Sequence, residues 1–202
     1  MTDFPIQRAT QQVEAVLAGT LHAPEVKSFF DEPTFTVSHV VSDAATKKAA
    51  IIDSVWNFDQ AAGRTSFDSA DQIVAYVEAH GLDIEWILET HAHADHLSAA
   101  PYLQDKLGGK LAIGREIVTV QGVFGKIFNE GTELARDGSQ FDRLLDDGDV
   151  LMIGEIPLLA LHVPGHTPAD IAYVIGDALF TGDTMFMPDY GSARADFPGG
   201  DA

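Results

Sequence analysis

Three histidines and an aspartate lie close together in one short segment of the chain. Residues 90–96 read Thr90-His91-Ala92-His93-Ala94-Asp95-His96. The apolar, partly β-branched residues 83–89 before them predict a strand, and the leucine spacing in residues 97–107 predicts a helix. The histidines therefore lie on a strand-to-helix loop, where their side chains can converge. Imidazole and carboxylate groups are ligands of zinc, iron and similar divalent metals, so the segment predicts a metal site.

Length and charge limit the classes of function that fit this chain. Its 202 residues are enough for one sizeable domain. Thirty-one acidic against 12 basic residues give a formal net charge of −19. This charge argues against a nucleic-acid partner, which needs a basic surface, and against an anionic membrane. A small anionic substrate remains compatible, because one metal and one arginine can dominate a pocket locally.

The chain contains no cysteine. Disulfides, cysteine zinc ligands and a cysteine nucleophile are therefore excluded. The residues after Met1 have neither the basic region nor the apolar core of a signal peptide, and no stretch is long and apolar enough to span a membrane. We therefore expect a cytoplasmic protein.

The remaining pattern indicates a sheet-rich α/β domain. Residues 1–24 read as an N-terminal extension, in which residues 10–17 form either a short helix or part of a loose arm. A helix over residues 70–80 is predicted to begin with a capping box at Ser69 and Gln72 and to end at Gly81. A further helical face is predicted within 115–128, followed by an irregular connection over 129–142. Strands are predicted at 34–41, 49–55, 84–88, 110–113, 150–153, 156–163, 171–175 and 178–180.

Two later motifs end predicted strands and carry possible ligands. His166 lies in the turn Pro164-Gly165-His166-Thr167, and Asp183 follows Gly182. Together with His91 they make two imidazoles and a carboxylate, the composition of the facial triad in non-haem iron sites. One or two zinc ions could instead be held if the neighbouring loop residues also contribute. Those additional candidates are His93, Asp95 and His96.

These motifs, in this order, resemble the metallo-β-lactamase superfamily. The resemblance runs from about Phe29 to the end of the chain, within a domain that we predict over residues 25–202. It implies an αβ/βα sandwich with the metal at the edge of two facing sheets. Two further segments resemble one branch of that superfamily, the sulfur (persulfide) dioxygenases and the related bacterial β-lactamase-like hydrolases. These segments are Phe29-Phe30-Asp31 with Thr34-Phe35-Thr36-Val37, and Gly191-Ser192-Ala193-Arg194-Ala195-Asp196-Phe197.

The resemblance to this branch implies a mononuclear Fe(2+) centre held by His91, His166 and Asp183. Arg194 would hold a carboxylate of the substrate. The expected substrate is glutathione persulfide or a similar small persulfide, oxidised to sulfite. Ala195 stands where relatives often carry a cysteine, which argues against a role for a protein thiol.

The end of the chain departs from the family pattern. The sequence stops soon after Asp183, whereas the family continues with further strand and helix. We therefore expect a domain that is incomplete at its C-terminus, with a second sheet that lacks part of its helical cover. An apolar sheet face without cover favours association between chains, so the sequence is compatible with a homo-oligomer.

Two other functions fit the same residues. A zinc hydrolase, such as a glyoxalase II-like thioesterase, a lactonase or a lactamase, would use zinc to generate hydroxide near neutral pH. In such an enzyme Asp95 would act catalytically by orienting the water or taking its proton, or would ligate a second zinc with His96. The third reading is a metal-binding domain without catalytic activity. Metal binding by His93, Asp95 and His96 is what separates a hydrolase from a dioxygenase.

Overall fold

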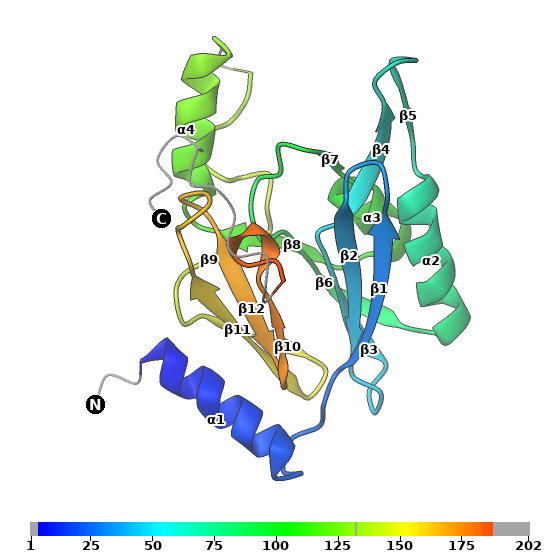
Figure 1. Ribbon diagram of the computed structural model, residues 1–202, viewed down its shortest axis with the longest axis vertical. Helices are drawn as coiled ribbons and strands as arrows, with labels where there is room; N and C mark the ends of the chain where they lie inside the picture. Colours follow the sequence, from blue (N-terminus) through cyan, green and yellow to red (C-terminus); the bar gives the residue numbers. More distant parts are fainter. Residues whose placement is uncertain (1–3, 132, 188–202) are drawn as a thin grey trace.

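Two β-sheets face each other in the fold (Figure 1). Apolar side chains from both sheets are buried between them. The computed structural model describes residues 4–131 and 133–187. The larger sheet has the order β1 (Glu25–Asp31), β2 (Thr36–Ser42), β3 (Lys48–Ile52), β6 (Asp83–Leu88), β8 (Lys110–Gly114), β9 (Arg143–Leu145). The smaller sheet has the order β10 (Val150–Ile153), β11 (Ile156–His162), β12 (Ile171–Ile175), β13 (Ala178–Phe180). A third set of strands comprises β5 (Arg64–Ser66), β4 (Val55–Asp59) and β7 (Leu97–Ser98).

Helices cover the outer face of the larger sheet. These two helices are α2 (Asp68–His80) and α3 (Ala100–Leu107). Of the other helices, α4 (Ile117–Ile127) follows β8 in the chain, and α1 (Pro5–Leu17) lies against β11 of the smaller sheet. The alternating side chains of β3 explain this layering, because successive residues of a strand point to opposite faces. Ala50 and Ile52 face the second sheet, whereas Ala49 and Ile51 pack under the helices. The predicted αβ/βα sandwich is confirmed.

Hydrogen bonds from side chains of α1 to backbone carbonyls fasten this helix to the second sheet. The Gln12 amide donates to the carbonyls of Val174 and Gly176 at 3.1 and 3.3 Å. The Arg8 guanidinium donates to the carbonyl of Gly148 at 3.2 Å. The helix begins five residues earlier than the sequence pattern indicated, because Pro5 suits the first turn of a helix, where no backbone donor is needed.

Most predicted strands and helices are confirmed, two further local predictions are wrong, and the strands β1, β4, β5 and β9 were not predicted. The helix expected over 97–107 begins at Ala100, because Leu97 and Ser98 pair with β4 as the short strand β7. Ser69 lies inside α2 and makes no cap; its hydroxyl donates to the carboxylate of Asp31 instead. The connection over 129–142 is followed by the unpredicted strand β9, whose three residues are too short for a periodic signal.

A backbone hydrogen bond joins the two sheets at the edge where the predicted ligands lie. The amide of Ile171 in β12 donates to the carbonyl of Thr90 at 2.9 Å. The buried hydroxyl of Tyr173 donates to the neighbouring carbonyl of Glu89 at 2.7 Å. The loop that carries His91 is therefore held by both sheets.

In the described part of the chain, no helix is long and apolar enough to cross a membrane.

Replacing Tyr173 with Phe tests this junction. The Glu89 carbonyl would lose its donor in a buried setting, so we expect Tyr173→Phe to lower the free energy of unfolding by about 1 to 3 kcal/mol. Urea denaturation measures the change. The matched control is Tyr102→Phe, whose hydroxyl bonds Asp71 at the surface and which should change stability by less than about 0.5 kcal/mol. Equal effects of the two substitutions would contradict the role of the junction.

Candidate metal centre

The ends of two neighbouring parallel strands position the first histidine of the candidate centre. Asp53 follows β3 with a left-handed φ of 52°, and its amide donates to the carbonyl of Leu88 in β6 at 3.0 Å. Its carboxylate accepts hydrogen bonds from the Thr90 amide at 2.7 Å and the Thr90 hydroxyl at 2.8 Å. This double contact fixes the chain direction at Thr90 and places His91 at the sheet edge.

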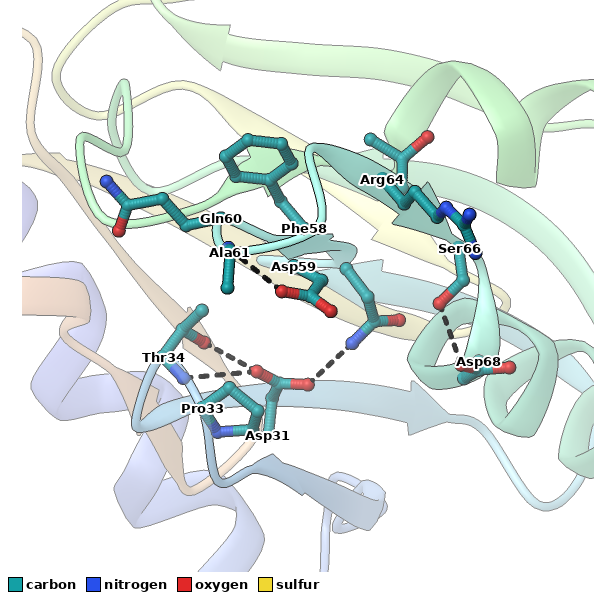
Figure 2. Close-up of a pocket in the computed structure, with 12 residues that line it drawn as sticks. Asp31, Pro33, Thr34, Phe58, Asp59, Gln60, Ala61, Arg64, Ser66 and Asp68 are labelled. Carbon is teal, nitrogen blue, oxygen red and sulfur yellow. Dashed lines mark hydrogen bonds between the residues drawn. The ribbon is translucent and has the colours of Figure 1, made fainter.

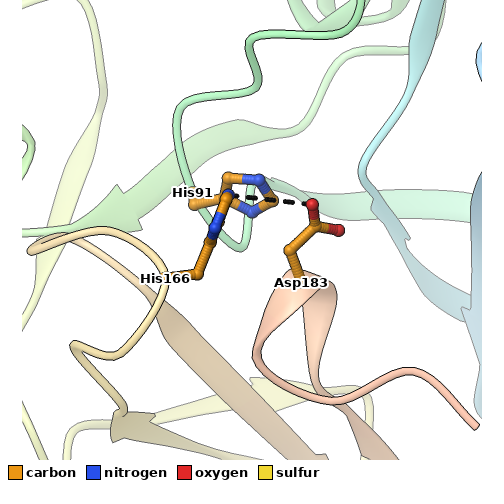
Figure 3. A group of neighbouring side chains, drawn as sticks. All are labelled: His91, His166 and Asp183. Carbon is orange, nitrogen blue, oxygen red and sulfur yellow. Dashed lines mark ion pairs between the residues drawn. The ribbon is translucent and has the colours of Figure 1, made fainter. Parts of the chain in front are cut away.

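His91, His166 and Asp183 come together from three separate loops (Figure 3). One ligand-type atom from each lies within 4.8 Å of the others. His166 Nε2 is 3.7 Å from Asp183 Oδ2, and the rings of His91 and His166 stand almost perpendicular at a centroid distance of 5.1 Å. Asp183 lies in the short 3₁₀ helix Gly182–Thr184 that follows β13. The structure thus brings together the three residues that the sequence singled out, although they are separated by up to 92 positions.

The side chain of His91 is suited to ligation. Burial, together with the nearby charge of His93, lowers the pKa of His91 to about 3, so the imidazole is neutral. Because the Thr90 hydroxyl donates its hydrogen to Asp53, its oxygen can accept from His91 Nδ1, which lies 2.9 Å away. This assignment leaves the lone pair on Nε2. The donor set therefore fits a divalent metal such as iron or zinc.

His93 is held by two buried carboxylates. Its Nε2 lies 3.1 Å from Asp53 Oδ1 and 3.2 Å from Glu89 Oε2. Burial alone would lower the pKa of His93, but the charge and hydrogen bond of Asp53, followed by those of Glu89, raise this pKa well above its usual value. Burial likewise opposes ionisation of Asp53, yet His93 lowers the pKa of that carboxyl to about 2. In the metal-free protein His93 is therefore an imidazolium whose Nε2 donates to Asp53 Oδ1 and forms an ion pair with Glu89 Oε2.

Asp95 and His96 form a second group with His93. One ligand-type atom from each of the three lies within 4.8 Å of the others. Asp95 is exposed and accepts a hydrogen bond from the Thr36 hydroxyl at 3.1 Å. His96 Nδ1 lies 3.0 Å from the carbonyl of Leu97, to which it can donate, and its Nε2 is buried without a hydrogen-bond partner among the described residues. This group could hold a second ion if His93 gave up its proton.

Two buried acids in the site escaped the sequence analysis. Asp53 and Glu89 each end a buried apolar strand, and the positions directly after β3 and β6 were the available signal. A further histidine supports the turn that carries His166, since His162 Nε2 lies 2.8 Å from the carbonyl of Pro168 and can donate to it. Arg194, the predicted substrate-binding residue, lies outside the described residues.

Comparison with known proteins identifies the family of this chain. The model of the metallo-β-lactamase superfamily matches residues 31–202. The chain belongs to the metallo-β-lactamase superfamily. A "Probable metallo-hydrolase" of Burkholderia pseudomallei is 54% identical over 88% of this chain and 64% of its own length. The mitochondrial persulfide dioxygenase of Bos taurus is 26% identical over 87% of this chain and 57% of its own length.

A solved structure supports the same membership. The crystal structure of ETHE1 from Myxococcus xanthus superposes with a TM-score of 0.66 and 25% sequence identity, over 88% of this chain and 64% of that chain. The chain spans 64% of the length of the Burkholderia relative. Members of this superfamily bind metal ions, so a metalloenzyme centre at His91, His166 and Asp183 is consistent with the family and with the geometry.

The buried contacts of Asp53 generate a stability prediction. Asp53→Asn would leave the His93 imidazolium with Glu89 as its one carboxylate partner. It would also place the new amide donor near the groups of Thr90 and His93 that donate to Asp53. We expect the metal-free protein to lose about 3 to 5 kcal/mol of unfolding free energy, as when one partner of a buried ion pair is removed. Lys48→Met, which breaks the exposed pair with Asp83, is the control and should cost less than about 1 kcal/mol. Urea unfolding in excess chelator gives both values; a loss for Asp53→Asn no larger than for the control would refute the assignment.

Proposed function

We propose that this chain is the catalytic domain of a persulfide dioxygenase with one iron(II) held by His91, His166 and Asp183. The observation that carries the proposal is the convergence of two imidazoles and one carboxylate. His91 is neutral, and one ligand-type atom from each of His91, His166 and Asp183 lies within 4.8 Å of the others. His93 Nε2 faces Asp53 and Glu89, so this nitrogen is not offered to the same ion. Two imidazoles and one carboxylate with open positions are the ligand set of non-haem iron oxygenases.

The overall reaction would convert a small persulfide, dioxygen and water into a thiol, sulfite and two protons. The outer sulfur gives up four electrons to dioxygen, and the sulfur–sulfur bond is replaced by an S–H bond on the thiol. Bound iron(II) would supply the redox chemistry with dioxygen. The protein residues would supply geometry: Asp53 and Thr90 hold the His91 ring in the tautomer that ligates through Nε2.

The substrate side of the proposal rests on the sequence. Glutathione persulfide or a similar small persulfide is the proposed substrate, and Arg194 is the proposed partner of its carboxylate, because a planar guanidinium matches carboxylate geometry. The 26% identity to a persulfide dioxygenase supports this class of substrate. Residues 1–24 and 25–202 remain our proposed division into extension and domain.

A metal-dependent hydrolase is the second candidate. Two observations favour it: the "Probable metallo-hydrolase" relative at 54% identity, and the group formed by His93, Asp95 and His96. In this candidate one or two zinc ions would activate water, and the exposed Asp95 would orient that water or accept its proton. The substrate would be a thioester, lactone or lactam.

Metal content and oxygen uptake distinguish the two candidates. Protein purified without air is expected to hold one iron per chain, to consume oxygen when given glutathione persulfide, and to release sulfite. Elemental analysis and an oxygen electrode provide the measurements. Protein reloaded with zinc serves as the control and should not consume oxygen, since zinc has no redox chemistry. Two zinc ions per chain, with thioester or lactone cleavage and no oxygen uptake, would favour the hydrolase.

Removal of one ligand tests the composition of the centre. Asp183→Ala is expected to reduce iron binding by at least about 100-fold and to abolish turnover, because two imidazoles remain without their carboxylate. The control is Asp177→Ala, an exposed aspartate in the turn between β12 and β13, which should keep one iron per chain. Iron retained by the Asp183 variant would remove Asp183 from the proposed ligand set.

A further inference from the structure

Phe35 has an unusual backbone conformation and an unusual exposure. It lies in the turn between β1 and β2 with a left-handed φ of 59°. Bulky side chains rarely adopt this conformation, because Cβ crowds the backbone. The side chain gains little from the fold in return, since the residue is 78% exposed. A strained backbone that presents an exposed aromatic ring calls for a functional explanation.

The residues on either side of Phe35 impose this conformation. The Thr34 amide and hydroxyl both donate to Asp31 Oδ2, at 3.2 and 2.8 Å (Figure 2). On the other side, the Thr36 hydroxyl donates to Asp95 Oδ2 at 3.1 Å. The turn is thus fastened at one end to a buried carboxylate and at the other end to the histidine loop. Phe35 keeps a fixed position relative to the metal centre.

The Asp31 anchor is itself rigid. Its second oxygen accepts hydrogen bonds from Ser69 Oγ in α2 at 2.7 Å and from Asn57 Nδ2 in β4 at 2.9 Å. The Asp31 residue is buried, and although burial opposes its ionisation, the hydrogen bonds from Ser69, Thr34 and Asn57 lower its pKa. The carboxylate therefore accepts at both oxygens from three elements of the fold, which keeps the turn from relaxing.

A cavity of about 640 Å³ has both Phe35 and Asp183, the carboxylate of the candidate metal centre, in its lining. Asp183, His93 and Asp95 line one part of it. Its apolar lining consists of Phe35, Val37, Leu179, Phe180, Met185, Phe186 and Met187. The cavity therefore joins a polar, ligand-bearing region to an apolar one that includes aromatic and thioether side chains. Such a surface suits a molecule with a sulfur atom at one end and an aliphatic stretch beside it, because methylene and sulfur groups both pack favourably on aromatic rings.

We propose that Phe35 is a substrate-contacting residue whose ring packs against the carbon skeleton of a thiol-derived substrate while the substrate's sulfur reaches the metal centre on the side of Asp183. The inference rests on the proposed function for the identity of the reacting group. It adds a specificity determinant: the substrate carries uncharged methylene groups next to its sulfur, and these groups lie on the Phe35 ring. The strain at Phe35 is then the cost of holding that ring over the cavity.

A matched pair of variants tests the contact. Phe35→Asn removes the ring with a residue that tolerates the left-handed conformation. Phe128→Asn removes another exposed phenylalanine, 67% exposed at the end of α4 and absent from the cavity lining. With glutathione persulfide and iron-loaded protein, we expect Phe35→Asn to raise KM by about 10-fold or more with iron content unchanged. Its midpoint of urea unfolding should stay equal or rise, and Phe128→Asn should leave KM unchanged.

A binding measurement separates this inference from the proposed reaction. Calorimetry with S-butylglutathione, an unreactive thioether, should give a dissociation constant that weakens about 10-fold in Phe35→Asn and not in Phe128→Asn. Phe35-dependent binding without oxygen uptake would refute the dioxygenase and leave the contact standing. Oxygen uptake with unchanged KM and unchanged thioether binding in Phe35→Asn would overturn the contact and leave the dioxygenase standing. A lowered urea midpoint in Phe35→Asn with unchanged KM, or a dimer that this variant abolishes with unchanged KM, would likewise overturn it.

Discussion

The carboxylate of Asp53 is the constraint on which the metal centre depends. It lies where β3 ends, takes two hydrogen bonds from Thr90 at the end of β6, and pairs with the His93 imidazolium. A buried charge is costly unless it is paired and hydrogen-bonded, so these three contacts must form together. Their joint formation determines the tautomer of His91 and the direction of His93. The sheet edge thereby supplies a shaped site before any ion is bound.

This network bears directly on the number of metal ions. The His93 Nε2–H that faces Asp53 and Glu89 cannot itself bind a metal, but its contact with the carboxylates orients the ring and leaves Nδ1 as the nitrogen that could. Ligation through Nδ1 would require loss of the Nδ1 proton only, and Nε2–H would stay with the two buried carboxylates. The network therefore fits His93 either as a support of a three-ligand centre or as a ligand of a second ion.

Sequence patterns predicted a sheet-rich α/β domain and the convergence of His91, His166 and Asp183 because both follow from local signals, whereas the sandwich was implied by the family resemblance. Apolar runs identify strands, and polar residues directly after them mark a sheet edge. The pairing of His93 with Asp53 could not be predicted, because it depends on which strands become neighbours. The predicted start of α3 was wrong for a similar reason. Leu97 and Ser98 pair with β4, and this tertiary contact overrides the helical spacing of the sequence. The strain at Phe35 likewise has no sequence signature, since phenylalanine is not a residue that favours that conformation.

The hydrogen bond from the Ile171 amide to the Thr90 carbonyl has a consequence for motion. This bond crosses between the two sheets immediately beside His91, so the sandwich cannot open at that edge without displacing the ligand loop. Separation of the layers and loss of the ligand geometry are therefore one event. An ion bound at His91 would slow the opening of the whole edge, because it adds its binding free energy to the closed state. The amide proton of Ile171 would exchange with solvent at a rate set by the occupancy of the centre.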